Sequence, residues 1–177
     1  TATGPGHFVI GSGQYPGPNG MMGNGFYDPI IKKHVNCVED PNATVVDNKG
    51  SARSYSRYTN TTLTHWIKSF NSESKIYSVA GKDRSAVLLG GQKPNLALYY
   101  NYNGAFVTSD YYTDENPKWL NDFNSTMNIP SYKDSLWNRS LDEQTYLKYS
   151  RPDYYVGEVD EYLNDPYSPT FPIGIEP

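Results

Sequence analysis

Apolar residues recur at helical spacing in the middle of the chain, just after Asn60-Thr61. Four of them stand at positions i, i+3, i+4 and i+7, which places their side chains on one face of an α-helix. They are Leu63, Trp66, Ile67 and Phe70. Because Asn and Thr often cap helix N-termini, the pattern predicts a helix that begins at Asn60 or Thr61.

A compact segment with β-branched residues follows at Lys75–Ala80, bounded by polar residues and Gly81. Its composition predicts a buried parallel strand. Ser85–Leu89 then predicts a short helix that stops at Gly90-Gly91. Helix, strand, polar turn and helix in this order are typical of an α/β fold.

Two aromatic-rich segments, Leu96–Tyr100 and Ala105–Tyr112, flank Asn103-Gly104. Asn-Gly is the preferred pair of a type I′ turn, so these segments are predicted to form a β-hairpin. We also expect a short helix over Pro117–Phe123 and a helical stretch near Ser140–Tyr149. The side chains expected to pack inward from the first of these helices are Trp119, Leu120 and Phe123.

The N-terminal part of the chain has weaker patterns. Phe8–Ile10 follows a Gly/Pro turn and predicts the opening of a short buried helix. Gly11–Gly23 is rich in Gly, Pro and Asn and is predicted to be a loop. The pattern over Asn24–Tyr58 is irregular, and the sequence beyond Ser125 is mostly loop-like.

Composition narrows the function classes. The 177 residues are 37% hydrophobic and carry a net charge of −4. This negative charge and the lack of a Lys/Arg cluster argue against a protein that binds nucleic acid. No run approaches the roughly 18 apolar residues that a membrane span needs. Cys37 is the one cysteine, so no internal disulfide forms, and a packed thiol is its simplest interpretation.

Three places carry candidate chemistry for holding a phosphoryl group. Thr1–His7 places hydroxyls in a Gly/Pro turn, and Asn24 closes a Gly-rich segment. Lys82 and Arg84 stand two residues apart, just after the predicted strand. Taken singly, Thr3 is an ordinary turn or capping residue, Asn24 a structural amide, and the basic tripeptide a solvated turn. Their combination points to function.

Each of these residue types suits phosphoryl chemistry. A threonine hydroxyl is a weak nucleophile at neutral pH, and coordination to a metal such as Zn²⁺ is one way to activate it. An asparagine amide steadies a phosphoryl oxygen without adding charge. A Lys point charge beside an Arg fork suits the dianion of a monoester.

Geometry is expected to bring these groups together. In extended backbone, residues i and i+2 project to the same side, so Lys82 and Arg84 are predicted to converge on one point. Backbone N–H groups at the helix start after Thr3 are expected to face the same anion.

In order and separation, these motifs resemble the nucleophile half of the alkaline phosphatase superfamily. The resemblance is closest to phosphate-irrepressible bacterial alkaline phosphatases, which are related to type I phosphodiesterases and nucleotide pyrophosphatases. Thr1–His7 is similar to the family's Thr-x-Thr-x-Pro-Gly-His, and Gly23–Asp28 to its Gly-Asn-x-x-Tyr-Asp. Asn19 departs from the pattern, since the family usually has His there.

The resemblance implies an α/β fold with a partial alkaline phosphatase-like parallel sheet. Within one incomplete domain, residues 1–95 would form the core segment, and residues 96–177 an inserted aromatic β-hairpin and a loop-rich cap. In the family, the threonine at the position of Thr3 binds zinc and attacks phosphorus, giving a covalent phosphothreonine. The resemblance assigns Asn24, Lys82 and Arg84 to binding of the transferred phosphoryl group.

The resemblance also implies two Zn²⁺ ions in the complete enzyme and a small phosphate ester as substrate. It implies a monomeric parent in a periplasmic or secreted location. The three histidines are His7, His34 and His65. His7 is expected to make a structural hydrogen bond and His65 to lie at the surface or boundary. The other Asp and His ligands would precede Thr1 or follow Pro177, so we expect no complete zinc site here and an inactive isolated piece.

Two alternatives stay open. The first is that the parent is a phosphodiesterase or nucleotide pyrophosphatase of the same superfamily, and Lys82 and Arg84 weigh against it. The second is that the parent is a non-catalytic relative that binds phosphate or glycan.

Overall fold

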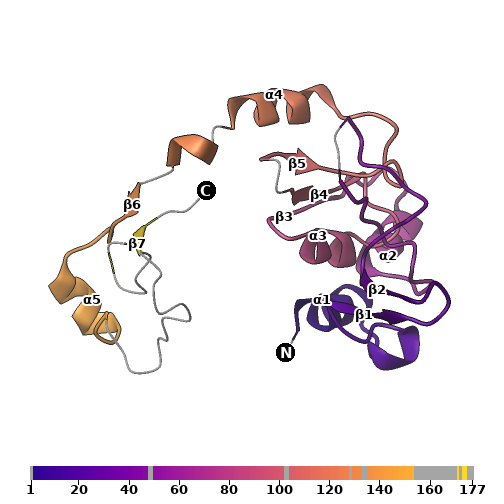
Figure 1. The fold of residues 1–177 in the computed structure, drawn as a ribbon, viewed down its shortest axis with the longest axis horizontal. Helices are drawn as coiled ribbons and strands as arrows, with labels where there is room; N and C mark the ends of the chain where they lie inside the picture. The colour runs from indigo at the N-terminus through magenta and orange to yellow at the C-terminus, as the bar shows by residue number, and fades with distance from the viewer. Residues whose placement is uncertain are drawn as a thin grey trace. The chain divides into compact units, whose positions relative to one another are not determined.

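The structure is a computed structural model. It describes residues 2–47, 50–101, 104–127, 129–132, 135–153, 171 and 173–174. The chain divides into two units, Thr1–Met127 and Asn128–Pro177. The residues with candidate chemistry lie in the first unit, coloured indigo to orange in Figure 1.

A three-stranded mixed sheet forms the centre of the first unit. β3 (Tyr77–Ala80) pairs in parallel with β4 (Leu96–Tyr100), and β4 pairs antiparallel with β5 (Phe106–Val107). The predicted hairpin is confirmed, although its second strand is shorter than the sequence suggested. Asn103 lies outside the described residues, so the type of its turn stays a prediction.

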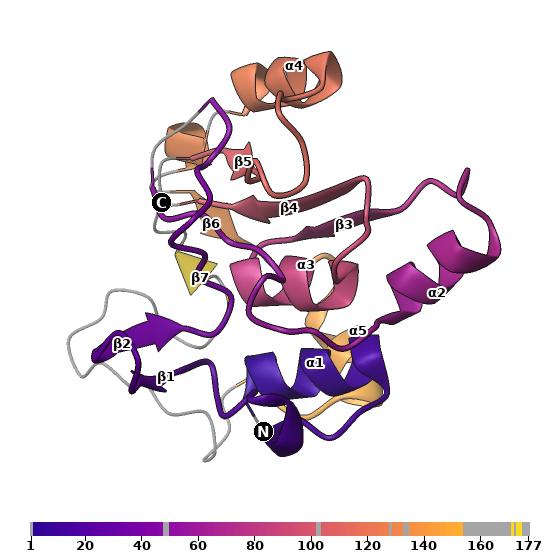
Figure 2. The ribbon, with the colours of Figure 1, turned by 90° about the vertical axis from the view of Figure 1, so that its right-hand side faces the viewer.

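Helices cover the two faces of this sheet, α3 (Asp83–Gly90) on one and α4 (Lys118–Thr126) on the other (Figure 2). The alternation of side chains along β4 explains this arrangement, because successive residues of a strand point to opposite faces. Leu96 and Leu98 pack against Leu120 of α4. The helices were both predicted, and α3 ends at the predicted glycines.

The prediction that the first strand is buried was wrong. In β3, Tyr77 is 53% and Val79 58% exposed. These side chains share the face of Leu96 and Leu98, their register partners, and α4 covers β4 but leaves β3 largely open. For the same reason Trp119 and Phe123 of α4, predicted to pack inward, are half exposed, while Leu120 is buried.

α1 (Thr3–Ser12) packs on the side of α3 that faces away from the sheet (Figure 2). It begins five residues before the predicted start, and the expected burial of Val9 and Ile10 was wrong, because both are exposed. Gly11 permits the close approach of the helices, since a Cβ there would lie 2.4 Å from the Leu88 carbonyl oxygen. The core beside these helices contains Phe8, Met21, Cys37, Val38, Tyr55, Tyr58, Val87 and Leu88.

The segment predicted to be irregular holds an antiparallel hairpin of β1 (Gly25–Asp28) and β2 (Lys33–Asn36). Sequence patterns missed it because the strands are four residues long and only Val35 is buried. A 3-10 turn, Gly17–Asn19, lies within the predicted loop.

The remaining elements complete the two units. α2 (Leu63–Phe70) forms as predicted, with Thr62 as its N-cap residue in place of Asn60 or Thr61, and its apolar face is exposed. The second unit contains a 3-10 turn, the predicted helix and a two-stranded sheet. These are η2 (Ile129–Tyr132), α5 (Glu143–Tyr149), and β6 (Leu136–Trp137) paired with β7 (Ile173–Gly174). Of the described helices, none is long and apolar enough to cross a membrane.

Candidate active site

Thr3 is the first residue of α1, and Asn24 is tied to the residue that follows it. The Gly4 amide donates a hydrogen bond of 2.6 Å to the Oδ1 of Asn24. A Cβ at Gly4 would lie 3.1 Å from the Cys37 Sγ and 3.2 Å from that Oδ1, so glycine allows this contact. The structure thus brings the predicted nucleophile and the predicted amide to one place.

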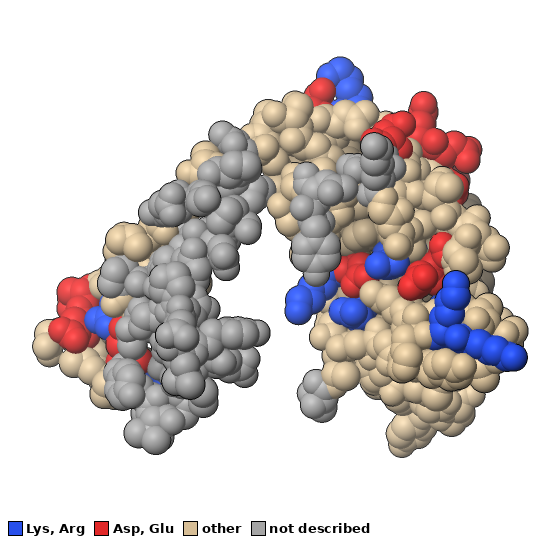
Figure 3. Space-filling view, in the orientation of Figure 1, with Lys and Arg blue, Asp and Glu red and all other residues tan. Residues whose placement is uncertain are grey.

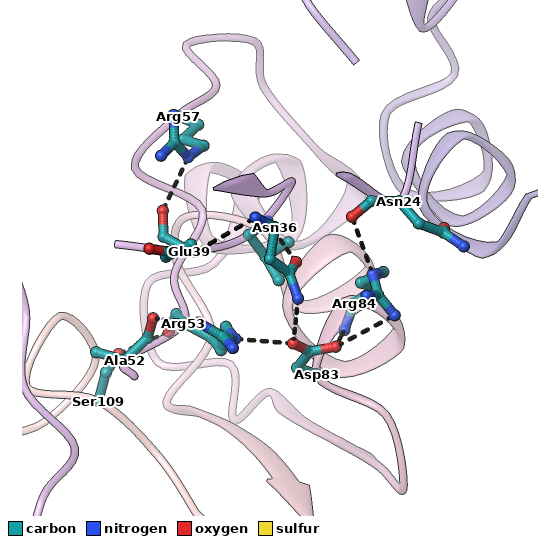
Figure 4. Close-up of polar contacts among 10 residues, drawn as sticks. Asn24, Asn36, Glu39, Ala52, Arg53, Arg57, Asp83, Arg84 and Ser109 are labelled. Atoms are coloured by element: carbon teal, nitrogen blue, oxygen red, sulfur yellow. Dashed lines mark hydrogen bonds and ion pairs between the residues drawn. The ribbon is translucent and has the colours of Figure 1, made fainter. Parts of the chain in front are cut away.

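Arg84 reaches the same place from α3. Its Nε donates to the carbonyl oxygen of Asn24 at 3.2 Å (Figure 4). The prediction that Lys82 and Arg84 converge along an extended backbone was wrong, because only Lys82 is extended. Lys82 is the N-cap residue of α3, and the helix begins at Asp83. Both cations nevertheless line one pocket of about 610 Å³.

This pocket lies where the parallel strands end. Gly81 follows β3 and Tyr100 ends β4, and both line it. The carboxyl ends of parallel strands are where open α/β sheets usually bind ligands. The prediction that the cations lie just beyond the carboxyl end of a parallel strand is confirmed, although their convergence along an extended backbone is not.

The expectation that backbone amides of the first turn of α1 face an anion does not hold for those of Gly4 and Gly6, which have partners within the protein. The Gly4 amide donates to Asn24 and the Gly6 amide to the Ala2 carbonyl oxygen, while Pro5 has no N–H. The dipoles of α1 and α3 still add positive potential at their N-terminal ends. Asn24 bonds both Gly4, near the start of α1, and Arg84, near the start of α3, so the two N-termini lie on the same side. Their positive ends therefore favour a bound anion.

A charged cluster surrounds Arg84, and sequence patterns did not reveal it. Asp83 accepts from Arg53 Nε at 2.8 Å and from Asn36 Nδ2 at 2.9 Å (Figure 4). These partners are 30 and 47 residues away in the chain, so no local motif links them. Basic and acidic side chains accordingly lie side by side on the α3 side of the first unit (Figure 3).

Two groups beside the site have structural roles. His7 Nδ1 hydrogen-bonds the Thr3 carbonyl oxygen at 2.8 Å, which confirms the predicted structural hydrogen bond. Burial raises the pKa of the Cys37 thiol to about 11, so it stays uncharged near Arg84. The thiol therefore does not compete as an anion for the cations of the pocket.

The residues present do not fit a zinc ion by themselves. Within the described ranges, no group of three or more His, Cys, Asp or Glu could hold a metal. His7 is engaged with the Thr3 carbonyl, and Asp83 is engaged with arginines. Within these residues, the resemblance implies only the Thr3 hydroxyl as a metal ligand.

Comparison with known proteins places this geometry in a family. Residues 1–162 match the type I phosphodiesterase / nucleotide pyrophosphatase family. The chain belongs to this family, within the alkaline phosphatase superfamily. Its fold is the α/β fold of that superfamily, as the resemblance implied.

The relatives include bacterial alkaline phosphatases. PhoV of Synechococcus elongatus is 35% identical, covering 84% of this chain and 28% of the relative. PafA of Elizabethkingia meningoseptica is 33% identical, covering 97% of this chain and 32% of PafA. The chain therefore spans about a third of the length of the curated relatives that it matches.

A solved PafA structure superposes with a TM-score of 0.82 and 30% identity, covering 98% of this chain and 34% of that one. The PafA in that crystal carries serine in place of one threonine. It also carries alanine in place of one asparagine, one lysine and one arginine.

Proposed function

We propose that the intact protein hydrolyses phosphate monoesters in a zinc-dependent reaction, through a covalent phosphothreonine on Thr3. The observation that carries the proposal is the connected set of contacts from the start of α1 to α3. Gly4, next to Thr3, binds the side chain of Asn24, and Arg84 binds the Asn24 backbone. These contacts bring Thr3, Asn24 and Arg84 together at the starts of α1 and α3; of the three, Arg84 lines the pocket, while Thr3 and Asn24 lie outside its lining.

The orientation of the Asn24 amide supports its role. Because Oδ1 accepts from the Gly4 amide, Nδ2 points the other way and is the group that can donate to a ligand. We propose that this Nδ2 binds a non-bridging oxygen of the phosphoryl group. Lys82 and Arg84 would bind the remaining charged oxygens, since a Lys point charge and an Arg fork both suit a dianion.

The proposed reaction has two steps. The Thr3 Oγ forms a bond to phosphorus as the ester P–O bond breaks, and the leaving oxygen takes up a proton. Water then attacks phosphorus, which releases inorganic phosphate and restores the Thr3 hydroxyl. Side chains that hold the phosphoryl oxygens stabilise the charge that develops in both steps.

Zinc bound to the Thr3 oxygen would supply what this step needs, which is stabilisation of the alkoxide at neutral pH. Because the described residues form no complete site, we derive no geometry for the metal. We propose that the other ligands belong to the part of the relatives' length that this chain does not span.

The altered PafA supports the same assignment. Its replaced residues are of the same four types as Thr3, Asn24, Lys82 and Arg84, in the same order. The threonine and asparagine are separated by the same number of positions as Thr3 and Asn24, and the lysine and arginine flank one residue.

The test uses the full-length protein and an aryl phosphate monoester. Thr3→Ala should lower kcat by at least about 10³-fold, while Thr3→Ser, which keeps the hydroxyl, should retain part of the activity. Chelation should abolish turnover and added zinc should restore it. Thr126→Ala, at an exposed position of α4, serves as the control. Undiminished turnover in Thr3→Ala would overturn the proposal.

A phosphodiesterase or nucleotide pyrophosphatase is the second candidate, because the matching family is described by those activities. Turnover of a monoester and a diester of the same aryl alcohol distinguishes the two. We expect faster monoester turnover, and we expect Arg84→Ala to slow the monoester far more than the diester. Phosphate binding without turnover of either ester would instead identify a non-catalytic relative.

A further inference from the structure

Asp83 lies between two arginines and contacts them unequally. Its Oδ2 accepts from Arg53 Nε at 2.8 Å and from Asn36 Nδ2 at 2.9 Å. Its Oδ1 accepts from the backbone amide of Arg84 at 2.7 Å, and the Arg84 guanidinium Nη1 lies farther away, at 3.8 Å. The carboxylate is therefore saturated by Arg53 and Asn36, and its ion pair with Arg84 is loose (Figure 4).

Because Asp83 is bound mainly by Arg53 and Asn36, the Arg84 side chain is directed toward Asn24. Its Nε donates to the Asn24 carbonyl oxygen, beside the start of α1. The side chains of Arg53, Asp83 and Arg84 are 18%, 17% and 25% exposed, so water screens their charges only partly. A carboxylate that lost Arg53 would close on the nearest remaining cation, which is Arg84.

Charge balance in the pocket points the same way. Among the described lining residues, the charged ones are Arg53, Lys82, Asp83 and Arg84. Three cations and one carboxylate leave a net charge of about +2 at neutral pH, which matches a phosphate dianion.

We propose that Arg53 is a positioning residue for the phosphoryl group, acting through Asp83. It neutralises and holds the Asp83 carboxylate, and so keeps the Arg84 guanidinium at Asn24 with its charge available to the ligand. The inference rests on the proposed role of Arg84 in binding phosphate. It adds a residue that no local motif around Lys82 and Arg84 contains.

The test measures the inhibition constant of inorganic phosphate on the full-length protein, with kcat and KM for an aryl phosphate. Arg53→Met should weaken phosphate binding about tenfold, the size expected for weakening one charge-assisted hydrogen bond. Arg53→Lys keeps the charge and should recover most of the affinity. The matched control is Arg57→Met, because Arg57 is 17% exposed, pairs with Asp28 at 3.1 Å and does not line the pocket. Its phosphate affinity should stay within about twofold of the parent's.

Two double variants separate positioning from general damage. Arg53→Met combined with Asp83→Asn restores the net charge and removes the carboxylate that would capture Arg84, so affinity should return to within about threefold. In an Arg84→Ala background, Arg53→Met should have no further effect. An Arg53 effect that persists there, or no recovery in the first double variant, overturns the positioning inference. If Arg84→Ala by itself leaves phosphate affinity unchanged, the proposed role of Arg84 fails instead.

Discussion

Replacing Gly11 by alanine tests the close approach of α1 and α3, the helices that carry Thr3 and Arg84. A Cβ at Gly11 would lie 2.4 Å from the Leu88 carbonyl oxygen and 3.4 Å from its carbonyl carbon. The methyl carbon must move by about 1 Å to reach an ordinary C···O contact of about 3.3 Å. Because the obstructing atom is backbone, the two helices must separate.

The expected cost follows from two opposing terms. Overpacking of this kind costs about 1–3 kcal/mol, and the helix propensity gained from Gly to Ala offsets about 0.5–1 kcal/mol of it. We therefore expect Gly11→Ala to destabilise the protein by about 0–2.5 kcal/mol, with a central value of about 1 kcal/mol. Separation of the helices would also displace Thr3 from Arg84, and a misplacement of about 1 Å can lower kcat by about 10²-fold.

The assay is urea unfolding of the full-length protein, with the initial rate on an aryl phosphate. Gly6→Ala is the matched control, because Gly6 is in the same helix and its Cβ would meet no atom within 4 Å. That variant should gain about 0.5–1 kcal/mol from helix propensity alone. If both variants are stabilised equally, α1 and α3 do not approach as closely as inferred, and the reasoning is refuted.

Three further predictions concern buried groups around the site. Burial acts to raise the pKa of Asp40, but hydrogen bonds, first of all from the Ser54 hydroxyl, outweigh it and hold this pKa below the usual 3.8. The ionised Asp40 therefore stabilises the folded protein above the usual pKa, and this stabilisation is lost as the pH falls through the folded-state pKa. Asp40→Asn should flatten the acid limb of the curve of unfolding free energy against pH, and an unchanged limb would contradict this. The Cys37 thiol is buried with a raised pKa, so a disulfide reagent at pH 8 should modify it only after unfolding, and rapid labelling of the folded protein would show otherwise. Tyr58→Phe removes the hydroxyl that donates to the Cys37 carbonyl at 2.8 Å and should cost about 1–2 kcal/mol in urea unfolding, whereas Tyr15→Phe, 84% exposed, should cost nothing measurable.

Much of the secondary structure could be predicted because its causes are local. The apolar spacing of α2, the two glycines at the end of α3 and the aromatic segments around Gly104 each act over a few residues. The predictions were wrong where packing against another element decides which side chains are buried. α1 begins at Thr3, with exposed Val9 and Ile10, because only its Phe8 side faces the core.

The candidate site divides in the same way. Thr3, Asn24, Lys82 and Arg84 were chosen from motifs, and their roles stay a proposal. The structure adds that Asn24 is bound from both sides, by the Gly4 amide and by Arg84. Motifs record which residue types recur in order, but they do not record which atom of an amide is occupied.

By itself, the sequence determined the local elements, the family and the residue types available for phosphoryl chemistry. The tertiary structure alone decided which strand face is covered, where Arg84 points and which charges offset one another. Asn36, Arg53 and Asp83 meet across 47 and 30 residues of chain. Such contacts form only when packing of the core repays the entropy of closing those loops, so no local pattern can encode them.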